Sequence, residues 1–562
     1  MNKINTILLL QIASIIILSF FIYATSLNGK FLWDDEFLVQ DNVYIKHFSM
    51  IPGIFTKTIG VGAGRESPCY RPLQMLTYMF DYSLWGLNAV GYHLTNIILH
   101  TIAALMLFWL VYLLYNRQLL SFLVSILFVS HPIHVEAVAY ISGRAESLAT
   151  IGIILCLICY IKQISLNKKM IFTLMILSFC AAILSKESSL IVPILILLYS
   201  YVFKKKILKK EFIYIVVTAL LYLIFRGLII KNTQIIGIPS VTIFQRIPGF
   251  FVAITRYLQL LFLPFNLHME YGNKLFLFSE FRAIAGVVIL FLLFGYAFKK
   301  RKDDKLKTFS VYWFFITLLP VSNLYSINAY MAEHWLYLPS LGFFLIIAHR
   351  LSSLYVIKKT KLLSIFLILF ILSGYSYLSL SQNAYWREPV AFYTKTISYA
   401  PNSVRLYLNL AKTYESAGNY KEAIGILEKA IEIDSKNSHT FNLLGTAYSA
   451  MGNRERAVIA YKKALSIDPN HADAYYNLGN EYIAIGDTEK AILSFKKAIE
   501  IAPKNIHAVS YYNNLASVYA ADGKISEAIE AYKKASEIDP NNIILQQNIK
   551  ILNSAIPNNK KR

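Results

Sequence analysis

Eleven runs of apolar residues recur along the first two thirds of the chain, and they constrain its fold more than any other feature. They lie at about 4–26, 94–115, 119–135, 147–165, 170–185, 188–203, 211–229, 282–298, 308–324, 336–350 and 362–381. Each approaches the roughly 20 residues that an α-helix needs to cross a bilayer. Since backbone polar groups must be satisfied inside lipid, such runs predict helices. Residues 1–381 are therefore predicted to form an all-α membrane domain with about eleven spans.

The first run, Ile7–Ala24, is expected to stay in the mature protein. It is longer than the apolar part of a signal peptide, and no small-residue cleavage site follows it. We therefore interpret it as the first membrane helix.

The distribution of positive charge predicts the orientation in the membrane. The formal net charge is +22, which by itself would be compatible with a nucleic-acid partner. Lys and Arg are concentrated, however, in the short loops 162–169, 204–210 (KKKILKK), 299–307 (KKRKDDKLK) and 350–361. The positive-inside rule makes these loops cytoplasmic, and no nucleic-acid partner is predicted.

With eleven spans, the N-terminus is predicted to be cytoplasmic and the C-terminal part extracytoplasmic. Residues 244–265 are predicted to form an interfacial or re-entrant helix, because a twelfth span would turn the basic loop 299–307 outward. The Ile-, Lys- and Asn-rich composition favours an AT-rich bacterial genome, and hence the bacterial plasma membrane.

A 34-residue repeat occupies residues 382–562. One position carries a small residue in every unit, and a second carries Gly where the chain must turn. These are Ala411, Gly445, Gly479 and Ala516, and Gly418, Gly452, Gly486 and Gly523. The pattern is typical of the tetratricopeptide repeat (TPR), with two helices per unit. It predicts about four repeats, preceded by one more helix at 388–400, in a solenoid whose concave face binds a protein acceptor or partner.

Polar clusters interrupt the apolar pattern in loops that are all predicted to face the same side of the membrane. The first is FLWDDEF, with Asp34 and Asp35 directly after the first run. Ionisable groups at a membrane segment are costly and therefore indicate function. The other candidate residues are Arg71, His131, His134, Glu136, Arg144, Lys186, Glu333, His334 and Tyr337. Their location at one face predicts a single site.

Several of these residues have a simpler explanation that stays open. Arg71 and Lys186 could extend their charged ends to the membrane surface without binding anything. His131, His134 and Glu136 have a spacing that metal ligands also use, but helix capping or ordinary hydrogen bonding explains it equally. No metal site is predicted firmly.

The motifs together resemble a known family. FLWDDEF, RPLQMLTYMFDYSLWGLNAVGYHLTNIILH, HPIHVEAVAYISGRAESLA, LSKESSLIVP and AEHWLYLPSLGF, followed by TPRs, are similar to the transmembrane-and-TPR O-mannosyltransferase family and its bacterial relatives, in the GT-C superfamily. The resemblance implies a GT-C membrane fold, a donor sugar on a polyprenyl phosphate, and a catalytic carboxylate pair at Asp34 and Asp35.

One motif departs from the family pattern. Relatives usually have an Arg near the Glu of AEHWLYLPS, whereas this chain has Glu333, His334 and Trp335. The phosphate recognition that the resemblance implies would then fall to His334, or to Arg71, Arg144 or Lys186.

The chemistry of such a transfer agrees with the residue types. A carboxylate can remove the proton of an acceptor hydroxyl, and cationic side chains can stabilise the departing phosphate. The predicted function is transfer of a hexose, mannose by resemblance, to a protein hydroxyl outside the cytoplasm. Asp35 is slightly favoured as the base, and a divalent cation at the other Asp stays open.

Three alternatives are kept. The first is a non-catalytic membrane scaffold that displays a TPR array for envelope assembly. The second is a GT-C enzyme that glycosylates a lipid or an envelope glycan. The third is a transporter, which would favour charged residues within the spans, and the apolar runs contain few.

Overall fold

The computed structural model describes residues 3–65, 67–166, 168–231, 241–272, 274–324, 327, 329–503, 506–540 and 542–555. Within these residues the chain is helical and contains no strand. Contacts divide it into two compact units, Met1–Phe392 and Tyr393–Arg562. The boundary follows α15, which continues past residue 381 to Arg387.

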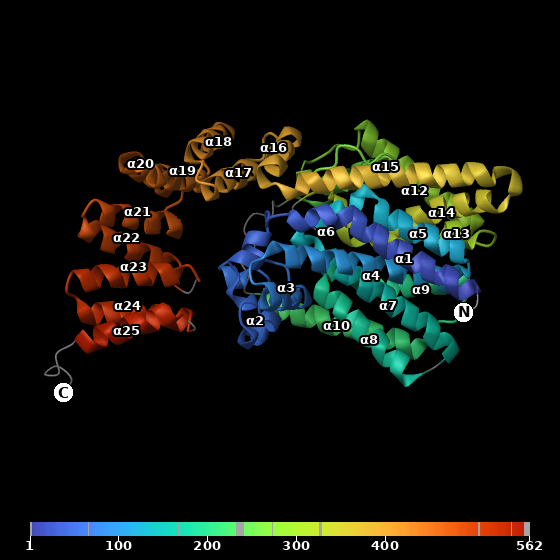
Figure 1. Ribbon diagram of the computed structural model, residues 1–562, viewed down its shortest axis with the longest axis horizontal. Coiled ribbons are helices and arrows are strands. Elements are labelled where there is room, and N and C mark those ends of the chain that lie inside the picture. The colour runs from blue at the N-terminus through green and yellow to red at the C-terminus, as the bar shows by residue number, and fades with distance from the viewer. Residues whose placement is uncertain are drawn as a thin grey trace. The chain divides into compact units, whose positions relative to one another are not determined.

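Each predicted apolar run lies on a helix of the first unit (Figure 1). The helices are α1 (Lys3–Tyr23), α4 (Ala89–Tyr115), α5 (Gln118–Ser130), α7 (Arg144–Leu166), α8 (Lys169–Ser185), α9 (Val192–Phe203), α10 (Lys209–Ile230), α12 (Phe281–Lys300), α13 (Lys305–Leu318), α14 (Ser340–Val356) and α15 (Lys361–Arg387). The prediction of an all-α domain rich in apolar helices is confirmed.

Fewer than eleven of these helices are long enough to span a bilayer alone. Among the described residues, six segments pass by length and composition: Thr6–Asn28, Ala89–Tyr115, Ile141–Leu166, Lys209–Ile230, Phe281–Lys300 and Lys358–Arg387. A seventh would be the pair Gln118–Ser130 and Pro132–Ala139, which is bent by 58°. Breaks at polar or proline-containing turns shorten the others. The count of eleven therefore stays a prediction.

α11 (Ile243–Phe262) coincides with the segment predicted to lie in the interface. Thr242 and Gln245 form a capping box that starts it. It is not among the segments apolar enough to span, in the part of the chain described. Residues 232–240, which lead into it, lie outside the described residues.

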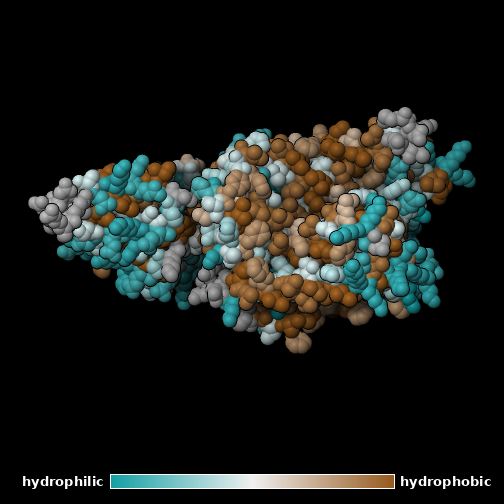
Figure 2. Space-filling model, turned by 90° about the horizontal axis from the view of Figure 1, so that it is seen from below, coloured by the Kyte–Doolittle hydropathy of each residue, from teal (hydrophilic) through white to brown (hydrophobic). Residues whose placement is uncertain are grey.

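The two ends of the first unit differ in polarity. The N-terminus and the turns that join α7 to α8 and α14 to α15 lie at one end of the bundle, while α2 (Ile51–Thr56) and α3 (Pro72–Trp85) lie at the other (Figure 1). Figure 2 shows a broad apolar surface between them, with hydrophilic side chains gathered at the end that holds the N-terminus. The unit has the surface pattern expected of a membrane domain.

The second unit is built from the predicted helix pairs. They are α17 (Val404–Ser416) with α18 (Tyr420–Ile433), α19 (Ser438–Ala450) with α20 (Arg454–Ile467), α21 (Ala472–Ala484) with α22 (Thr488–Ile501), and α23 (Ala508–Ala521) with α24 (Ile525–Ile538). α16 (Pro389–Tyr399) is the predicted preceding helix. A further helix, α25 (Ile543–Ala555), follows the last pair and was not predicted from the repeat.

The conserved spacing of small residues has a steric cause within the array. Each turn glycine has a positive φ, between 74° and 81°, which residues with a Cβ rarely adopt. At Gly445 an added Cβ would lie 2.5 Å from the ring of Tyr461. The small residue thus allows the first helix to pack directly on the aromatic side chain of the second helix.

Candidate active site at the polar end of the membrane unit

The FLWDDEF segment follows α1 and η1 (Ala24–Asn28) as a tight loop. Trp33 is buried and has a φ of 53°, which is unfavourable for a bulky residue and therefore strains the loop. Asp35 fixes the loop from inside. Its Oδ1 accepts hydrogen bonds from the Ser142 backbone N–H at 2.9 Å and the Ser142 hydroxyl at 2.5 Å, and its Oδ2 accepts one from the Leu32 N–H at 3.0 Å.

The two adjacent aspartates have different environments. Asp35 is 1% exposed, and burial raises its pKa to about 7, although its hydrogen bonds to Ser142 and Leu32 oppose that rise. Asp34 is only half-buried, and its backbone N–H donates to the Tyr140 hydroxyl at 3.0 Å. Tyr140 and Ser142 therefore hold the loop from two sides, with Asp34 nearer to solvent.

A row of alternating acidic and basic side chains lies beside the start of α7. Lys186 pairs with Glu146, and both side chains are about nine-tenths buried. His334 Nδ1 lies 2.8 Å from Glu136 Oε1, and its Nε2 lies 3.9 Å from Glu146 Oε1. The His334 backbone N–H also donates to Glu136 Oε2 at 3.0 Å. The predicted residues Glu136, Lys186 and His334 thus meet, with Glu146 between the two basic groups.

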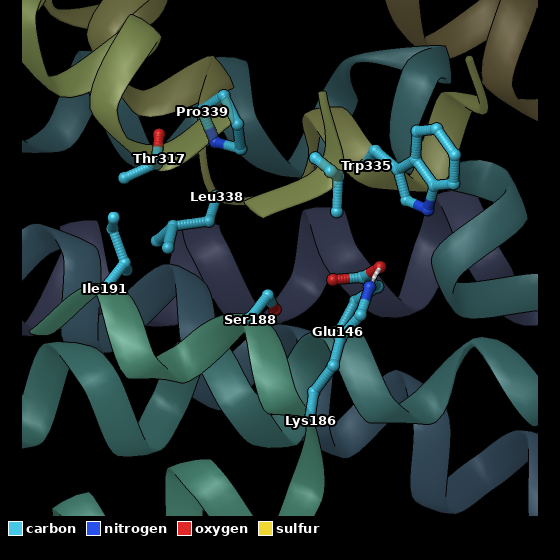
Figure 3. Close-up of a pocket in the computed structure, with 9 residues that line it drawn as sticks. Glu146, Lys186, Ser188, Ile191, Thr317, Trp335, Leu338 and Pro339 are labelled. Carbon is cyan, nitrogen blue, oxygen red and sulfur yellow. Dashed lines mark hydrogen bonds and ion pairs between the residues drawn. The ribbon is translucent and has the colours of Figure 1, made fainter. Parts of the chain in front are cut away.

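These side chains border a small cavity of about 20 Å³ (Figure 3), which is roughly the room that one water molecule needs. Lys186 and Glu146 approach each other at one side, and Trp335 lies beside them (Figure 3). The remaining wall includes the apolar side chains of Ile191, Leu338, Val321 and Pro339. The cavity therefore combines the Lys186–Glu146 ion pair with a wall that is partly apolar.

Arg71 lies in the same electrostatic neighbourhood. Its Nε and Nη2 donate to the two oxygens of Glu187 at 3.1 and 2.9 Å, a bidentate pair that stays partly exposed. Glu187 directly follows Lys186, and Glu146 acts electrostatically on Arg71. Arg71 and Lys186 are therefore two partly satisfied cations at one end of the unit.

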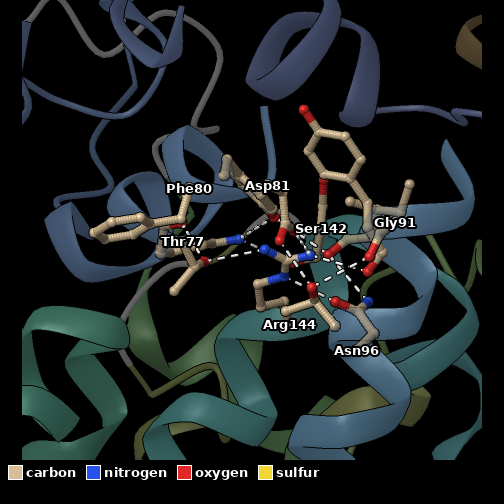
Figure 4. Close-up of polar contacts among 12 residues, drawn as sticks. Thr77, Phe80, Asp81, Gly91, Asn96, Ser142 and Arg144 are labelled. Atoms are coloured by element: carbon tan, nitrogen blue, oxygen red, sulfur yellow. Dashed lines mark hydrogen bonds and ion pairs between the residues drawn. The ribbon is translucent and has the colours of Figure 1, made fainter. Parts of the chain in front are cut away.

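Arg144 is placed differently from the other predicted cations. It is completely buried and forms a 2.6 Å ion pair with Asp81. Its other donors reach Asn96 Oδ1 at 2.8 Å, the Tyr92 carbonyl at 3.0 Å and Thr77 Oγ1 at 3.2 Å (Figure 4). With its guanidinium enclosed by α3, α4 and α7, Arg144 joins these helices and has its donors occupied within the protein.

The two histidines of HPIHVE are also used inside the protein. His131 accepts from the Ile133 N–H at 3.1 Å and contacts the Leu261 carbonyl at 3.0 Å. His134 contacts the Phe128 carbonyl at 2.7 Å and the Ser340 hydroxyl at 3.0 Å. Both are fully buried and have both ring nitrogens occupied. Within the described ranges, no three His, Cys, Asp or Glu side chains are arranged to hold a metal ion.

Glu333 and Tyr337 support the loops around the site. Glu333 Oε1 accepts from the His268 N–H at 2.5 Å and the Tyr271 hydroxyl at 2.7 Å. The Tyr337 hydroxyl lies 2.7 Å from His100 Nδ1 and accepts from Ser147 at 3.0 Å. The AEHWLYLPS motif therefore presents His334 and Trp335 to the site, while the residues on either side of them anchor it.

Five residues that complete these contacts were not among the predicted site residues. Tyr140, Ser142 and Glu146 lie inside the quoted HPIHVEAVAYISGRAESLA region, and Glu187 lies in LSKESSLIVP, so their motifs gave a signal. Asp81 also lies in a quoted motif, RPLQMLTYMFDYSLWGLNAVGYHLTNIILH, but a single Asp on an apolar helix reveals its partner only when the helices are packed.

The comparisons with known proteins agree with the motifs. The tetratricopeptide repeat family matches residues 403–470, 472–505 and 509–542. A protein O-mannosyl-transferase of Caenorhabditis elegans is 29% identical over 445 residues, which cover 75% of this chain and 62% of the relative. The human protein O-mannosyl-transferase TMTC1 is 25% identical over 500 residues, which cover 75% of this chain and 55% of the relative.

Among solved structures, the crystal structure of MamA is similar with 32% identity and a TM-score of 0.24, and covers 27% of this chain and 86% of its own. The chain spans less than two thirds of the length of the two curated relatives just described. The resemblance inferred from the motifs is confirmed, and the chain is a homologue of the TMTC-type protein O-mannosyl-transferases with a C-terminal TPR array.

Proposed function

We propose that the chain transfers a hexose, mannose by homology, from a polyprenyl phosphate to a hydroxyl group of a protein on the extracytoplasmic face. One observation carries the proposal. Ser142, which binds Asp35, lies in the short 3-10 helix η7 (Ile141–Gly143), and Glu146, which binds Lys186, lies four residues later in the first turn of α7. The acidic loop and the charged cavity therefore converge on one short segment.

The cavity has the two surfaces that a lipid phosphate needs. The apolar residues of its lining would contact the first isoprene units once the site opens around a bound donor, and Lys186 suits the phosphate. In the structure Lys186 is paired with Glu146, which also lies near His334. Binding of the phosphate would draw Lys186 away from Glu146, and His334 would retain the Glu146 carboxylate. Arg71 would be the second cation available to the phosphate.

Asp34 is the better candidate for the general base. A base must lie within hydrogen-bond reach of the acceptor proton, and Asp34 is the more exposed of the pair. Asp35 is enclosed with three donors on its carboxylate, so we assign it to holding the loop. This assignment reverses the slight preference for Asp35 drawn from the sequence.

The transfer then balances without a redox partner. The acceptor oxygen forms a bond to the anomeric carbon while the bond between that carbon and the phosphate oxygen breaks. The hydroxyl proton passes to Asp34, and polyprenyl phosphate leaves with its added negative charge near Lys186 and Arg71. These reaction steps do not require a resident metal ion.

The polarity of the membrane unit supports the proposed orientation. The basic connections lie at the end with the N-terminus, whereas the acidic loop lies at the end with α2 and α3 (Figure 1). If the basic end is cytoplasmic, the site opens outward, where a lipid-linked sugar would be reached. The TPR array would lie on the same side and recruit the acceptor.

Glycoproteomics of a strain without the gene tests the function. The proposal expects a hexose to disappear from Ser or Thr of extracytoplasmic proteins, and to return with the wild-type gene but not with Asp34→Asn. Loss of a sugar from a lipid or glycan alone would favour the envelope-glycan alternative. Unchanged glycosylation with defective envelope assembly would favour the scaffold.

A further inference from the structure

α15 continues past the apolar run that predicts it. The run ends at residue 381, whereas the helix ends at Arg387. We call residues 382–387 the α15 extension. Their spacing on the helix puts four side chains on one face, and all four are buried. They are Gln382, Asn383, Tyr385 and Trp386.

The α15 extension contacts the chain just before the acidic loop begins. Asn383 Nδ2 donates to the carbonyl of Ile22 at 2.9 Å, in the last turn of α1. Glu388, which follows the extension, lies 3.8 Å from Lys30 in an exposed ion pair, and Lys30 directly precedes FLWDDEF. The extension therefore holds the entry to the acidic loop mainly through Asn383, because an exposed ion pair contributes little.

Trp386 reaches the acidic loop itself through Tyr140. The two rings are stacked, with centroids 5.5 Å apart and planes inclined by 30°. The Tyr140 hydroxyl accepts the hydrogen bond from the Asp34 backbone N–H at 3.0 Å. Trp386 is 2% exposed and Tyr140 is 6% exposed, so solvent does not separate the rings. The backbone of Asp34 is thus linked to Trp386 by one hydrogen bond and one ring contact.

Only the side chain of Tyr140 depends on Trp386. The backbone carbonyl of Tyr140 is held separately, by a hydrogen bond of 3.1 Å from Asn96 Nδ2. Trp386 is packed in turn against the ring of Phe392, with centroids 4.7 Å apart. Within the described residues its indole N–H has no hydrogen-bond partner. Trp386 therefore acts by packing, and another aromatic ring could replace it.

We propose that Trp386 is a positioning residue for Asp34 and acts through Tyr140. The inference rests on the proposed function in taking Asp34 as the general base. The Trp386 ring limits the orientations of the Tyr140 ring, whose hydroxyl then fixes the backbone at Asp34. A base that is slightly displaced from the acceptor hydroxyl loses much of its rate. Donor binding should be spared, because Lys186 and Arg71 are held by Glu146 and Glu187 instead.

Steady-state transfer by the full-length protein in liposomes tests the effect on turnover. The substrates are polyprenyl-phosphate mannose and an unstructured Ser- and Thr-containing peptide. Trp386→Ala should lower kcat about 10- to 100-fold and leave the KM for the donor within about twofold. Trp386→Phe should restore kcat to within about threefold of wild type, because it keeps the ring contact. A raised KM with unchanged kcat, or no recovery in Trp386→Phe, would overturn the inference.

Tyr377→Ala is the matched control for Trp386→Ala. It also removes an aromatic ring from α15, but the Tyr377 side chain is 72% exposed. Its kcat should equal that of wild type. A decrease as large as that of Trp386→Ala would show that loss of any ring from α15 lowers turnover, and would overturn the assignment.

Hydrogen exchange reports the position of the loop without any sugar transfer. It is measured by mass spectrometry on the peptide that covers residues 30–37. Trp386→Ala and Tyr140→Phe should each speed exchange there about 3- to 10-fold, as expected for the loss of one hydrogen bond. The double variant should resemble Tyr140→Phe alone in exchange and in kcat, because both changes act through one contact. Additive effects would overturn the inference.

Two outcomes separate this inference from the proposed function. Faster loop exchange in Trp386→Ala, together with a wild type that transfers no sugar, would contradict the proposed function alone. Unchanged loop exchange in Trp386→Ala, with an active wild type, would contradict this inference alone. If Trp386→Ala does not fold, Tyr140→Phe carries the test, because it removes only one oxygen. Normal exchange and normal kcat in Tyr140→Phe would then overturn the inference.

Discussion

The membrane unit and the TPR array use charged residues in opposite ways. In the membrane unit the important pairs are buried, as Arg144–Asp81 and Lys186–Glu146 are. In the array the ion pairs lie at the surface between neighbouring turns of one helix or beside a turn, as Lys490–Asp487 does. The array is shaped instead by small residues and turn glycines. The difference indicates that charge in the membrane unit is placed for packing or chemistry, while in the array it mainly provides solubility.

The largest expected effect concerns chemistry in the membrane unit. Asp34→Asn keeps the shape of the side chain but removes its basicity, so transfer should fall roughly 10²- to 10⁴-fold. Its thermal stability should stay near wild type, because the side chain is half exposed. Asp41→Asn, an exposed acid after the same loop, is the control. Wild-type turnover by Asp34→Asn would show that Asp34 is not the general base.

The second expected effect compares ion pairs directly. Arg144→Gln leaves Asp81 buried without its partner, which should cost about 3–5 kcal/mol of stability. Lys490→Gln should leave the melting temperature of the chain unchanged, since both partners lie at the surface. Thermal unfolding in detergent measures both. Equal losses of thermal stability in the two variants would contradict the proposed difference between the units.

The third expected effect separates substrate binding from turnover. Lys186→Met should raise the KM for the polyprenyl-phosphate sugar about 10- to 100-fold, as expected for a charged hydrogen bond. Lys162→Met, at the basic end where Lys162 lies 4.5 Å from the ring of Trp109, should leave the KM unchanged. An unchanged KM in Lys186→Met would show that the cavity does not bind the donor.

The fourth expected effect is a pH dependence from Asp35. Burial raises its pKa to about 7, so the ionised form that Ser142 and Leu32 bind is lost as the pH falls below that value. Transfer should therefore decrease below about pH 7, and the decrease should be absent in Asp35→Asn.

The raised pKa of Asp35 affects the stability of the fold in the opposite direction from its effect on transfer. The folded protein holds the Asp35 proton more tightly than the unfolded chain, so the contribution of Asp35 is greatest below about pH 4 and is lost as the pH rises to about 7. Melting temperatures across this range, compared with Asp35→Asn, measure it. A rise of the Asp35-dependent stability with pH would contradict the burial of this carboxyl.

The smallest expected effect lies in the array. Gly486 has a φ of 81°, and Gly486→Ala should cost about 1–2 kcal/mol because a Cβ disfavours that conformation. Unfolding of the array should shift while transfer to a short soluble peptide stays unchanged. Loss of that transfer would show that the array is part of the catalytic unit.

The two units also differ in how far the sequence predicts them. In the array each repeat contacts its neighbours, so the 34-residue spacing predicts every helix from α17 to α24. α25 was missed because it lacks the repeat. In the membrane unit, the apolar runs predict where helices lie, but not their length, because turns at positions such as Lys186 and Pro320 break them.

The site illustrates the same limit. The motifs name Asp34, Lys186 and His334 as candidates. They do not reveal that Arg144 is committed to Asp81, since that contact depends on the packing of α3 against α7. Nor does the sequence distinguish the buried Asp35 from the half-buried Asp34. That distinction follows from the contact of the loop with Ser142.

Transfer by the purified full-length chain in liposomes tests the central claim most directly. The donors are polyprenyl-phosphate mannose and a nucleotide-linked mannose, offered separately with an unstructured Ser- and Thr-containing peptide. The account predicts release of polyprenyl phosphate in equal amount to hexose bound to peptide hydroxyls, and no transfer from the nucleotide sugar. Folded protein that releases no polyprenyl phosphate, or that uses the nucleotide sugar, would contradict it.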